Sequence, residues 1–205
     1  MGTSGAGLRE RKKAMTRIAL VDAALDLFAA KGFDHTTVDE ITEACDVSRR
    51  TFFRYFASKE DIFSDGKGEH DAEMFELIAA RPADEPALAS LRAAVLAIAA
   101  DLAADRTRLM AKVRVINETP SLRSARLDDE QATVDDIVEA LARRSPGPVD
   151  DDEAFRLRLV TQAAVGALRA AVERWAANGG TADLVDVAIE ALDLLAAAFG
   201  REPSS

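Results

Sequence analysis

The stretch Ser48–Phe56 concentrates side chains that suit contacts with a nucleic-acid duplex. Three arginines, a threonine and two aromatic residues lie within seven positions: Arg49, Arg50, Thr51, Phe53, Arg54 and Tyr55. Arginine can bond guanine edges or phosphate, threonine and phenylalanine can contact a thymine methyl group, and tyrosine can bond phosphate. Phe52 and Phe56 are spaced i, i+4 and are expected to share a buried helix face. The cationic and aromatic side chains are then left exposed, as in a helix that lies in a DNA groove.

Two short helices joined by a tight turn are predicted to position this stretch. Thr37 and Glu40 have the spacing of a capping box, which starts a helix. An apolar stripe at i, i+3 and i+7 begins at Val38 and is interrupted at Asp46. Ser48 then offers an N-cap for the second helix. This geometry is that of a helix-turn-helix, with the second helix as the recognition helix.

Four motifs in the right order resemble the DNA-binding domain of the TetR/AcrR family over about residues 14–64. They are GF at 32–33, TTVDEI at 36–41, VSRRTFFRYF at 47–56 and SKEDIF at 58–63. The resemblance implies a homodimeric, ligand-controlled transcriptional regulator that is expected to repress transcription by binding palindromic operator DNA. The RRTFFRYF form resembles a branch whose relatives include proposed acyl-CoA-responsive regulators.

The resemblance also implies roles for individual residues. Base-edge contacts are predicted for Arg49, Arg50, Thr51 and Phe53. Phosphate or sugar contacts are predicted for Thr36, Thr37, Tyr55 and Lys59. Ser48 and Arg54 complete the predicted DNA-binding set, although Arg54 stands where the family often has an aromatic residue.

The composition predicts an all-α protein. Hydrophobic residues make up 48% of the 205 residues but aromatic residues only 5%, so alanine, leucine and valine must build the core. The abundance of Ala, Leu, Arg and Glu favours helix, and no alternating strand pattern is present. We therefore predict an N-terminal three-helix helix-turn-helix domain and a C-terminal helical bundle, about nine helices in total.

Charge is distributed unevenly along the chain. The net charge is −10, but residues 1–60 carry 10 Lys+Arg and 9 Asp+Glu, which leaves −11 for the rest. One acid, Glu10, lies among five basic residues between positions 8 and 17: Arg9, Arg11, Lys12, Lys13 and Arg17. Because the local field matters more for docking than the total charge, the N-terminal part can approach DNA while the acidic remainder points away.

Three segments are expected along the chain. Residues 1–13 form a basic N-terminal arm, disordered at least over the Gly/Ser-rich positions 1–8, and are followed by the DNA-binding domain at 14–64. Its first helix is predicted at about 15–30, with an apolar face made by Ile18, Val21, Leu25 and Phe28. Residues 65–205 form a ligand-binding and dimerisation domain.

The fourth helix is predicted at about 58–81 with a break near Gly66 and Gly68. Two glycines inside a helix cost about 1 kcal/mol each relative to alanine. The break is either a hinge between the two domains or a plain loop between two helices. The family resemblance favours the hinge.

Two long helices are predicted at about 151–177 and 181–199. Apolar and small residues nearly encircle both, which one core face does not explain. A second buried face in a two-fold dimer does. The family resemblance also places a dimer interface on the last two helices, as a four-helix bundle.

An effector pocket is predicted among apolar residues of the second domain. The candidates are Met74, Leu77, Ile78, Leu91, Val95, Met110, Val113, Ile116 and Gln162. Each also suits a plain core position, since methionine is common where packing is irregular. Arg114, Arg123 and Arg126 either bind an acidic head group or form solvated surface. The predicted effector is small and largely apolar, and it acts by binding the DNA-incompetent form more tightly.

Catalytic, cofactor and metal chemistry are not indicated. The sequence has no H-E-x-x-H, G-x-S-x-G, P-loop or G-x-G-x-x-G motif, and its two histidines and one cysteine offer no triad or metal framework. No uncharged apolar run of about 18 residues and no signal core are present, so we predict a cytoplasmic protein without a membrane partner. The alternative left open is a helical binding protein whose helix-turn-helix engages a protein, which would lack the steep salt dependence of DNA binding.

Overall fold

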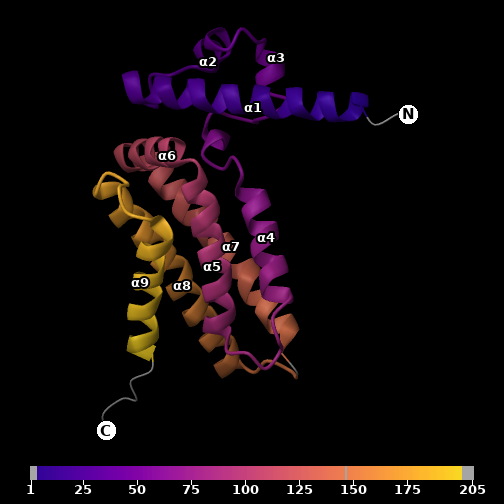
Figure 1. The fold of residues 1–205 in the computed structure, drawn as a ribbon, viewed down its shortest axis with the longest axis vertical. Helices are drawn as coiled ribbons and strands as arrows, with labels where there is room; N and C mark the ends of the chain where they lie inside the picture. Colours follow the sequence, from indigo (N-terminus) through magenta and orange to yellow (C-terminus); the bar gives the residue numbers. More distant parts are fainter. Residues whose placement is uncertain (1–3, 146, 200–205) are drawn as a thin grey trace. The chain divides into compact units, whose positions relative to one another are not determined.

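The computed structural model describes residues 4–145 and 147–199, and over these residues it contains nine α-helices and no β-strand (Figure 1). The α-helices are α1 (Ser4–Lys31), α2 (Val38–Ala44), α3 (Arg49–Phe52), α4 (Lys67–Ala79), α5 (Ala87–Ala104), α6 (Arg106–Glu118), α7 (Pro120–Arg144), α8 (Asp151–Ala177) and α9 (Leu184–Phe199). A single 3₁₀ turn, η1, covers Glu60–Ile62. The predicted all-α class and helix number are confirmed.

The chain divides into two compact units. The first unit runs up to Gly66 and also contains Ala111–Leu122. The second unit contains Lys67–Met110 and the chain from Arg123 onward. The second half of α6 therefore belongs to the first unit, which the predicted boundary at residue 65 did not anticipate.

The core of the first unit gathers residues from α1, the helix-turn-helix, α6 and the start of α7. Its buried members are Leu20, Val21, Ala24, Leu25, Phe28, Phe33, Ile41, Phe52, Phe56, Ile62, Val115, Ile116 and Leu122. The Phe28 ring lies 5.1 Å from Phe33 and 5.6 Å from Phe63, centroid to centroid. Ile18, which was expected on the apolar face of the first helix, is exposed.

The basic N-terminal segment is helical from Ser4, because α1 begins there rather than near residue 15. The expected disorder of residues 1–8 is corrected for positions 4–8, and residues 1–3 lie outside the described residues. Arg9, Lys12 and Lys13 are therefore carried on an α-helix and their side chains are exposed.

The break predicted within the fourth helix lies at Gly66, which has a φ of 85° and separates the segment after η1 from α4. Helix α4 starts at Lys67 instead of near residue 58, and Gly68 lies inside it. Asp65 is held from two sides: the guanidinium of Arg17 in α1 bonds its carboxylate, and Lys112 Nζ in α6 donates to its carbonyl oxygen over 3.1 Å. The end of the first unit is thus fixed to both helices.

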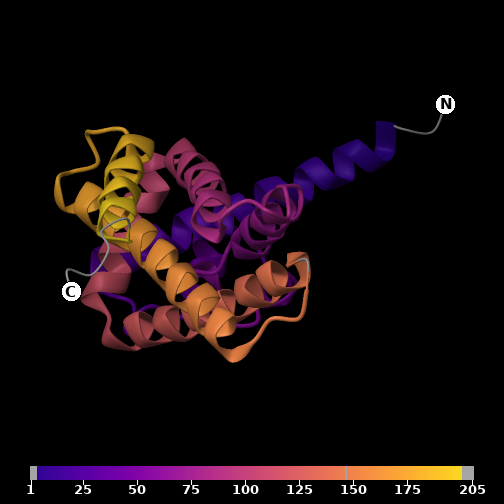
Figure 2. The same cartoon turned by 90° about the horizontal axis from the view of Figure 1, so that it is seen from below.

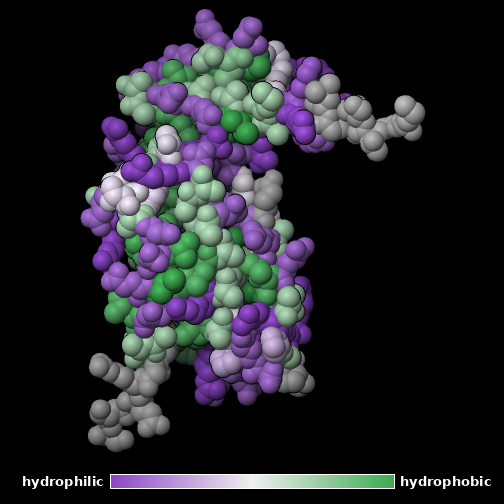
Figure 3. All heavy atoms as spheres, in the orientation of Figure 1, coloured by the Kyte–Doolittle hydropathy of each residue, from purple (hydrophilic) through white to green (hydrophobic). Residues whose placement is uncertain are grey.

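Helix α5 is a core helix of the second unit and packs against α4, α8 and α9. It is long and apolar enough to cross a membrane by length and composition alone. Its two charged residues are engaged within the unit: Arg92 forms an ion pair with Asp193 at 2.7 Å, and the Asp101 carboxylate lies 2.5 Å from His70 Nε2, within hydrogen-bonding distance. Hydrophobic residues gather over α5 on the face that Figure 3 shows. These contacts are those of a core helix in a folded bundle.

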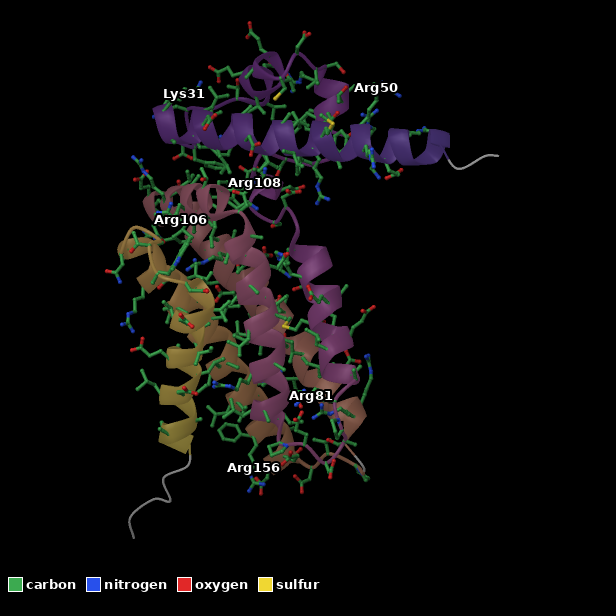
Figure 4. The ribbon with its side chains drawn as sticks, in the orientation of Figure 1. Lys31, Arg50, Arg81, Arg106, Arg108 and Arg156 are labelled. Atoms are coloured by element: carbon green, nitrogen blue, oxygen red, sulfur yellow. The ribbon has the colours of Figure 1, made fainter. Side chains whose placement is uncertain are left out.

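Helices α8 and α9 lie side by side, as Figures 1 and 2 show. The loop between them is fixed by hydrogen bonds from Arg106 of α6. Arg106 donates from Nε to the carbonyl of Gly180 and from a terminal nitrogen to that of Gly179, both over 2.6 Å (Figure 4). Trp175 Nε1 donates to the carbonyl of Ala182 over 2.8 Å. Gly180 has a φ of 63°, and an added Cβ would lie 2.9 Å from the Trp175 ring, so only glycine fits there.

Candidate nucleic-acid interface

Helix α2 starts with the predicted capping box. Thr37 Oγ1 accepts from the backbone N–H of Glu40, and the Glu40 carboxylate accepts from the Thr37 N–H over 2.8 Å. Lys31 also bonds this carboxylate, and together these donors lower the pKa of Glu40 to about 2. Glu40 is therefore ionised at neutral pH and keeps the start of α2 capped.

The turn between the two helices is a Schellman motif. The N–H of Val47 bonds the carbonyl of Thr42 over 3.0 Å, and the N–H of Asp46 bonds that of Glu43 over 3.1 Å. Asp46 has a φ of 51°, a left-handed conformation that aspartate adopts more readily than most non-glycine residues. The interruption predicted at Asp46 is thus the C-terminal cap of α2, and it sets the direction in which α3 leaves.

Helix α3 is short and continues as a turn. Ser48 caps it by accepting from the backbone N–H of Thr51 over 3.1 Å, as predicted. Regular α-helix ends at Phe52, and the N–H groups of Arg54 and Tyr55 bond carbonyls three residues back. The predicted helix through residue 56 is therefore one α-helical turn followed by tighter turns.

Phe52 and Phe56 anchor this segment, as their spacing predicted. Both are buried in the core of the first unit, with ring centroids 5.6 Å apart. Cys45 packs at the edge of the same core and its thiol donates to the carbonyl of Ala19 over 3.2 Å. Burial raises the pKa of this thiol, so it is a packed group and not an activated nucleophile.

The outer side of α3 carries the predicted base-contacting side chains. Arg49 bonds Asp39 of α2 over 3.1 Å, and its guanidinium lies 5.8 Å from the Phe53 ring, which is 48% exposed. Arg50 is exposed on α3 (Figure 4) and forms no ion pair within the described part of the chain. The residue that sequence analysis missed is Asp39, which orients Arg49; only the fold brings residues 39 and 49 together.

Arg54, which is exposed, and Tyr55, which is half-buried against the core of the first unit, form a second pair just after α3. Arg54 donates to the Tyr55 hydroxyl over 3.1 Å, and its guanidinium lies 4.9 Å from the ring. This contact holds Arg54 at the surface next to the recognition segment. Thr37 and Ser48 are also exposed, whereas Thr51 is half-buried and its hydroxyl lies 3.0 Å from that of Ser48.

The prediction for Thr36 is corrected by the structure. Its side chain is 1% exposed and its hydroxyl donates to the carbonyl of Gly32 over 2.9 Å, so it cannot reach DNA. Its carbonyl accepts from Lys59 Nζ over 3.0 Å, and that ammonium also donates to the carbonyl of Phe33 over 2.7 Å. Lys59 keeps a third donor, and its DNA contact stays a prediction.

Two family models match the chain. The model described as "Bacterial regulatory proteins, tetR family" matches residues 20–65, and the model described as "MftR C-terminal domain" matches residues 85–200. The HTH-type transcriptional regulator TcmR of Streptomyces glaucescens is 34% identical over 200 residues, which cover 94% of this chain and 88% of TcmR. The chain belongs to the TetR family of bacterial transcriptional regulators.

Solved structures share the TetR-family fold of this chain. The fatty acid degradation regulator FadR from Bacillus halodurans has a TM-score of 0.65 at 20% identity, covering 91% of this chain and 97% of FadR. FadR from Bacillus subtilis, solved in complex with stearoyl-CoA, has a TM-score of 0.58 at 22% identity. The match covers 87% of this chain and 96% of that FadR chain. At these identities the likeness establishes a common fold.

Family membership confirms the main functional prediction from the sequence. The chain is a DNA-binding TetR-family regulator and not an enzyme. The helix-turn-helix described above is the part that the TetR-family model matches, since its residues lie between 20 and 65. The contacts predicted for individual side chains, other than Thr36, stay predictions.

The predicted effector-pocket residues do not form one group. Met74, Ile78, Leu91 and Val95 are buried together in the core of the second unit, and Leu77 packs against them. Three others lie elsewhere: Ile116 is part of the first unit's core, Val113 is buried on the α6 segment that belongs to the first unit, and Gln162 is exposed on α8. Met110 is half-buried. Ile116 and Gln162 therefore lie outside the buried group of the second unit, and the effector pocket stays a prediction.

A groove of about 550 Å³ lies elsewhere on the second unit, between α4 and α7. Phe75, Ala79 and Ala140 form its apolar wall, and Asp136 and the ion pair of Arg143 with Glu139 also line it. Arg144 also lines the groove and is fixed by hydrogen bonds to Ile78 O, Ser90 Oγ and Glu85 O over 2.8–3.2 Å. Its size is that of a small-molecule site. The sequence signal that could have indicated this groove is the i, i+4 pair Phe75 and Ala79. These two residues lie one position beyond Met74 and Ile78, which were predicted to line the effector pocket.

The three arginines predicted to bind an acidic head group differ in their surroundings: Arg126 is engaged within the protein, Arg114 pairs with Glu118 over 3.0 Å, and Arg123 is exposed. Arg126 of α7 bonds Glu173 of α8 over 2.7 Å and lies 3.6 Å from Glu130. Arg169 of α8 bonds Glu130 over 2.9 Å. Burial raises the pKa of Glu130 despite both arginines. This network joins α7 to α8, although Arg126 Nε is buried without a hydrogen-bond partner among the described residues.

Proposed function

We propose that this TetR-family chain is a homodimeric repressor that binds a two-fold symmetric operator and is released by a small amphipathic effector of the acyl-CoA type. The observation that carries the proposal is the exposed cationic and aromatic side of α3. Arg49, Arg50 and Phe53 are presented there by a helix-turn-helix whose caps and buried anchors fix the backbone. Such a surface suits base edges in the major groove. We expect the protein to act in the cytoplasm, where operator DNA lies.

Dimerisation through α8 and α9 is supported by the apolar residues that these helices leave exposed. Phe155 and Leu194 are each 66% exposed, and Leu159 lies one helical turn from Phe155 on α8. Further along α8, a Cβ added to Gly166 would meet nothing within 4 Å, so the helix surface there is open to a close neighbour. A two-fold axis would bury both helices against their copies. Two DNA-binding units would then face two half-sites.

Leu194→Glu is expected to raise the dimer dissociation constant by at least about tenfold, because a carboxylate would be buried without a partner at the interface. The matched control is Leu127→Glu on α7, where the leucine is also exposed, at 51%, but lies off the α8 and α9 surface. Sedimentation velocity across a dilution series measures both. Equal dissociation constants for the two variants would place the dimer interface elsewhere.

The effector assignment is supported by the groove between α4 and α7 and by the fold shared with FadR. The groove offers an apolar wall at Phe75, Ala79 and Ala140, and its charged lining consists of Asp136, Glu139, Arg143 and Arg144. An acyl chain fits the wall, and an anionic head group can take the place of Glu139 on Arg143. The Bacillus subtilis FadR structure contains stearoyl-CoA. Release requires that the effector bind the DNA-incompetent form more tightly than the DNA-bound form.

Stearoyl-CoA is expected to release the protein from its operator, and coenzyme A alone is not, because only the former supplies an apolar chain. Fluorescence anisotropy of the labelled operator complex measures this at constant salt. Ala140→Trp, which fills the groove, is expected to weaken the release. A complex that persists at saturating stearoyl-CoA excludes this effector class, and release from Ala140→Trp equal to wild type moves the site away from the groove.

A further inference from the structure

A second cationic groove lies in the first unit, alongside the recognition segment. It has a volume of about 850 Å³ and runs between the N-terminal turns of α1 and the end of α3. Its lining consists of Arg9, Glu10, Lys12, Lys13, Thr16, Arg54 and Tyr55. Four of these seven side chains are basic and one is acidic. The groove is therefore cationic in a chain whose total charge is −10.

Helix periodicity explains why α1 contributes so much positive charge to this groove. Arg9, Lys12, Lys13 and Thr16 are spaced i, i+3, i+4 and i+7, so they share one face of the helix. Within the described part of the chain, the three basic side chains are exposed and form no ion pair. Arg11 falls on the opposite side of the helix and does not line the groove.

The other wall is ordered by the recognition segment itself. The contact between Arg54 and Tyr55, with the guanidinium 4.9 Å from the ring, fixes a cation at this wall. The groove is therefore continuous with the exposed side of α3 that is proposed to meet DNA. Figure 1 shows that the N-terminal turns of α1 continue past α3. The family's DNA-binding model matches the chain only from residue 20, so Arg9 to Thr16 lie before it.

We propose that this groove holds the phosphate backbone of the duplex that flanks each half-site, a sequence-independent contact outside the helix-turn-helix. The inference rests on the proposed operator binding and adds a second contact region to it. Exposed cations without protein partners, on a helix face next to a base-contacting surface, complement the regularly spaced charges of a phosphate backbone. They contribute affinity and register, and they carry no base specificity.

Lys12→Ala and Arg11→Ala test the proposal as a matched pair. Each variant removes one positive charge from adjacent exposed positions of α1, and alanine preserves the helix. Affinity is measured by fluorescence anisotropy from 50 to 300 mM salt. One probe is a duplex that contains the binding site obtained by selection from a random duplex pool, with about ten flanking base pairs on each side. The other probe is a random duplex of equal length.

Each lost phosphate contact lowers the slope of log K against log salt by about 0.9. In a dimer we therefore expect Lys12→Ala to lower the slope by about 1.8 on both long probes, while Arg11→Ala leaves it unchanged. Lys12→Ala/Lys13→Ala is expected to double the loss. On a duplex trimmed to the edges of the site, wild type and Lys12→Ala are expected to bind alike.

Equal slopes for Lys12→Ala and Arg11→Ala would overturn the groove contact. Wild-type binding to the selected site would in that case leave the proposed operator function intact. A wild-type protein that shows no salt-dependent binding to either duplex would overturn both the groove contact and the operator function.

Discussion

Phe52→Ala is expected to destabilise the first unit by about 3–5 kcal/mol, the usual loss when a buried phenylalanine is truncated. Phe52 is fully buried and its ring contacts Phe53 and Phe56 at 5.4 and 5.6 Å. It joins α3 to the core formed with α1 and Ile41 of α2. A loss of this size is a large part of the stability of a small domain. The helix-turn-helix is therefore expected to unfold and DNA binding to disappear.

Urea unfolding followed by circular dichroism measures this loss, and Trp175 separates the two units. Trp175 is the only tryptophan and is buried in the second unit, so its fluorescence follows that unit alone. We expect Phe52→Ala to lose part of the helical signal at low urea while the Trp175 transition stays in place. Phe53→Ala is the control, because Phe53 is exposed and its truncation is expected to leave stability nearly unchanged. Equal destabilisation by both variants would refute the anchoring role of Phe52.

Arg49→Ala/Arg50→Ala is expected to lower operator affinity by at least about a hundredfold without loss of stability. A bidentate arginine contact to guanine is worth about 1–3 kcal/mol, and two such contacts are removed. Both side chains are exposed on α3, and Arg49 gives up only a surface ion pair with Asp39. Surface pairs of this kind contribute little to folding. The loss is therefore expected in specific binding and not in the fold.

The matched control for this variant is Arg143→Ala/Arg156→Ala, which removes two exposed arginines of the second unit. Its charge change is identical, so any effect of net charge on DNA binding appears in both variants. Anisotropy titrations with specific and random duplexes give the specificity ratio. We expect the ratio to fall for Arg49→Ala/Arg50→Ala and to stay unchanged for the control. Equal ratios would remove α3 from base recognition.

Local features of the helix-turn-helix could be predicted because neighbouring residues encode them. Thr37 and Glu40 specify the capping box, Ser48 specifies the second cap, and the i, i+4 spacing specifies the burial of Phe52 and Phe56. The length of α3 was overestimated, since the same apolar spacing is compatible with a tighter turn after Phe52. Periodicity indicates which side chains share a face but not how the backbone ends.

Contacts between distant segments could not be predicted from the sequence. Thr36 has a side chain suited to phosphate, but Gly32 and Lys59 enclose it and it is buried. Ile116 lies at an apolar position of a helix that was predicted to belong to the ligand-binding domain, yet it packs in the core of the first unit. Residues 4–8 have the composition of a flexible arm, and the structure continues α1 through them. In each case tertiary packing decides the outcome over local preference.

Selection of bound sequences from a random duplex pool at near-physiological salt tests the central claim most directly. The wild-type chain is predicted to enrich a two-fold symmetric site, with half-sites separated by about one helical turn or a multiple of it. Arg49→Ala/Arg50→Ala is predicted to enrich no defined site while remaining folded. Failure of the folded, effector-free wild-type protein to enrich any sequence would contradict the assignment of α3 as a base-contacting helix.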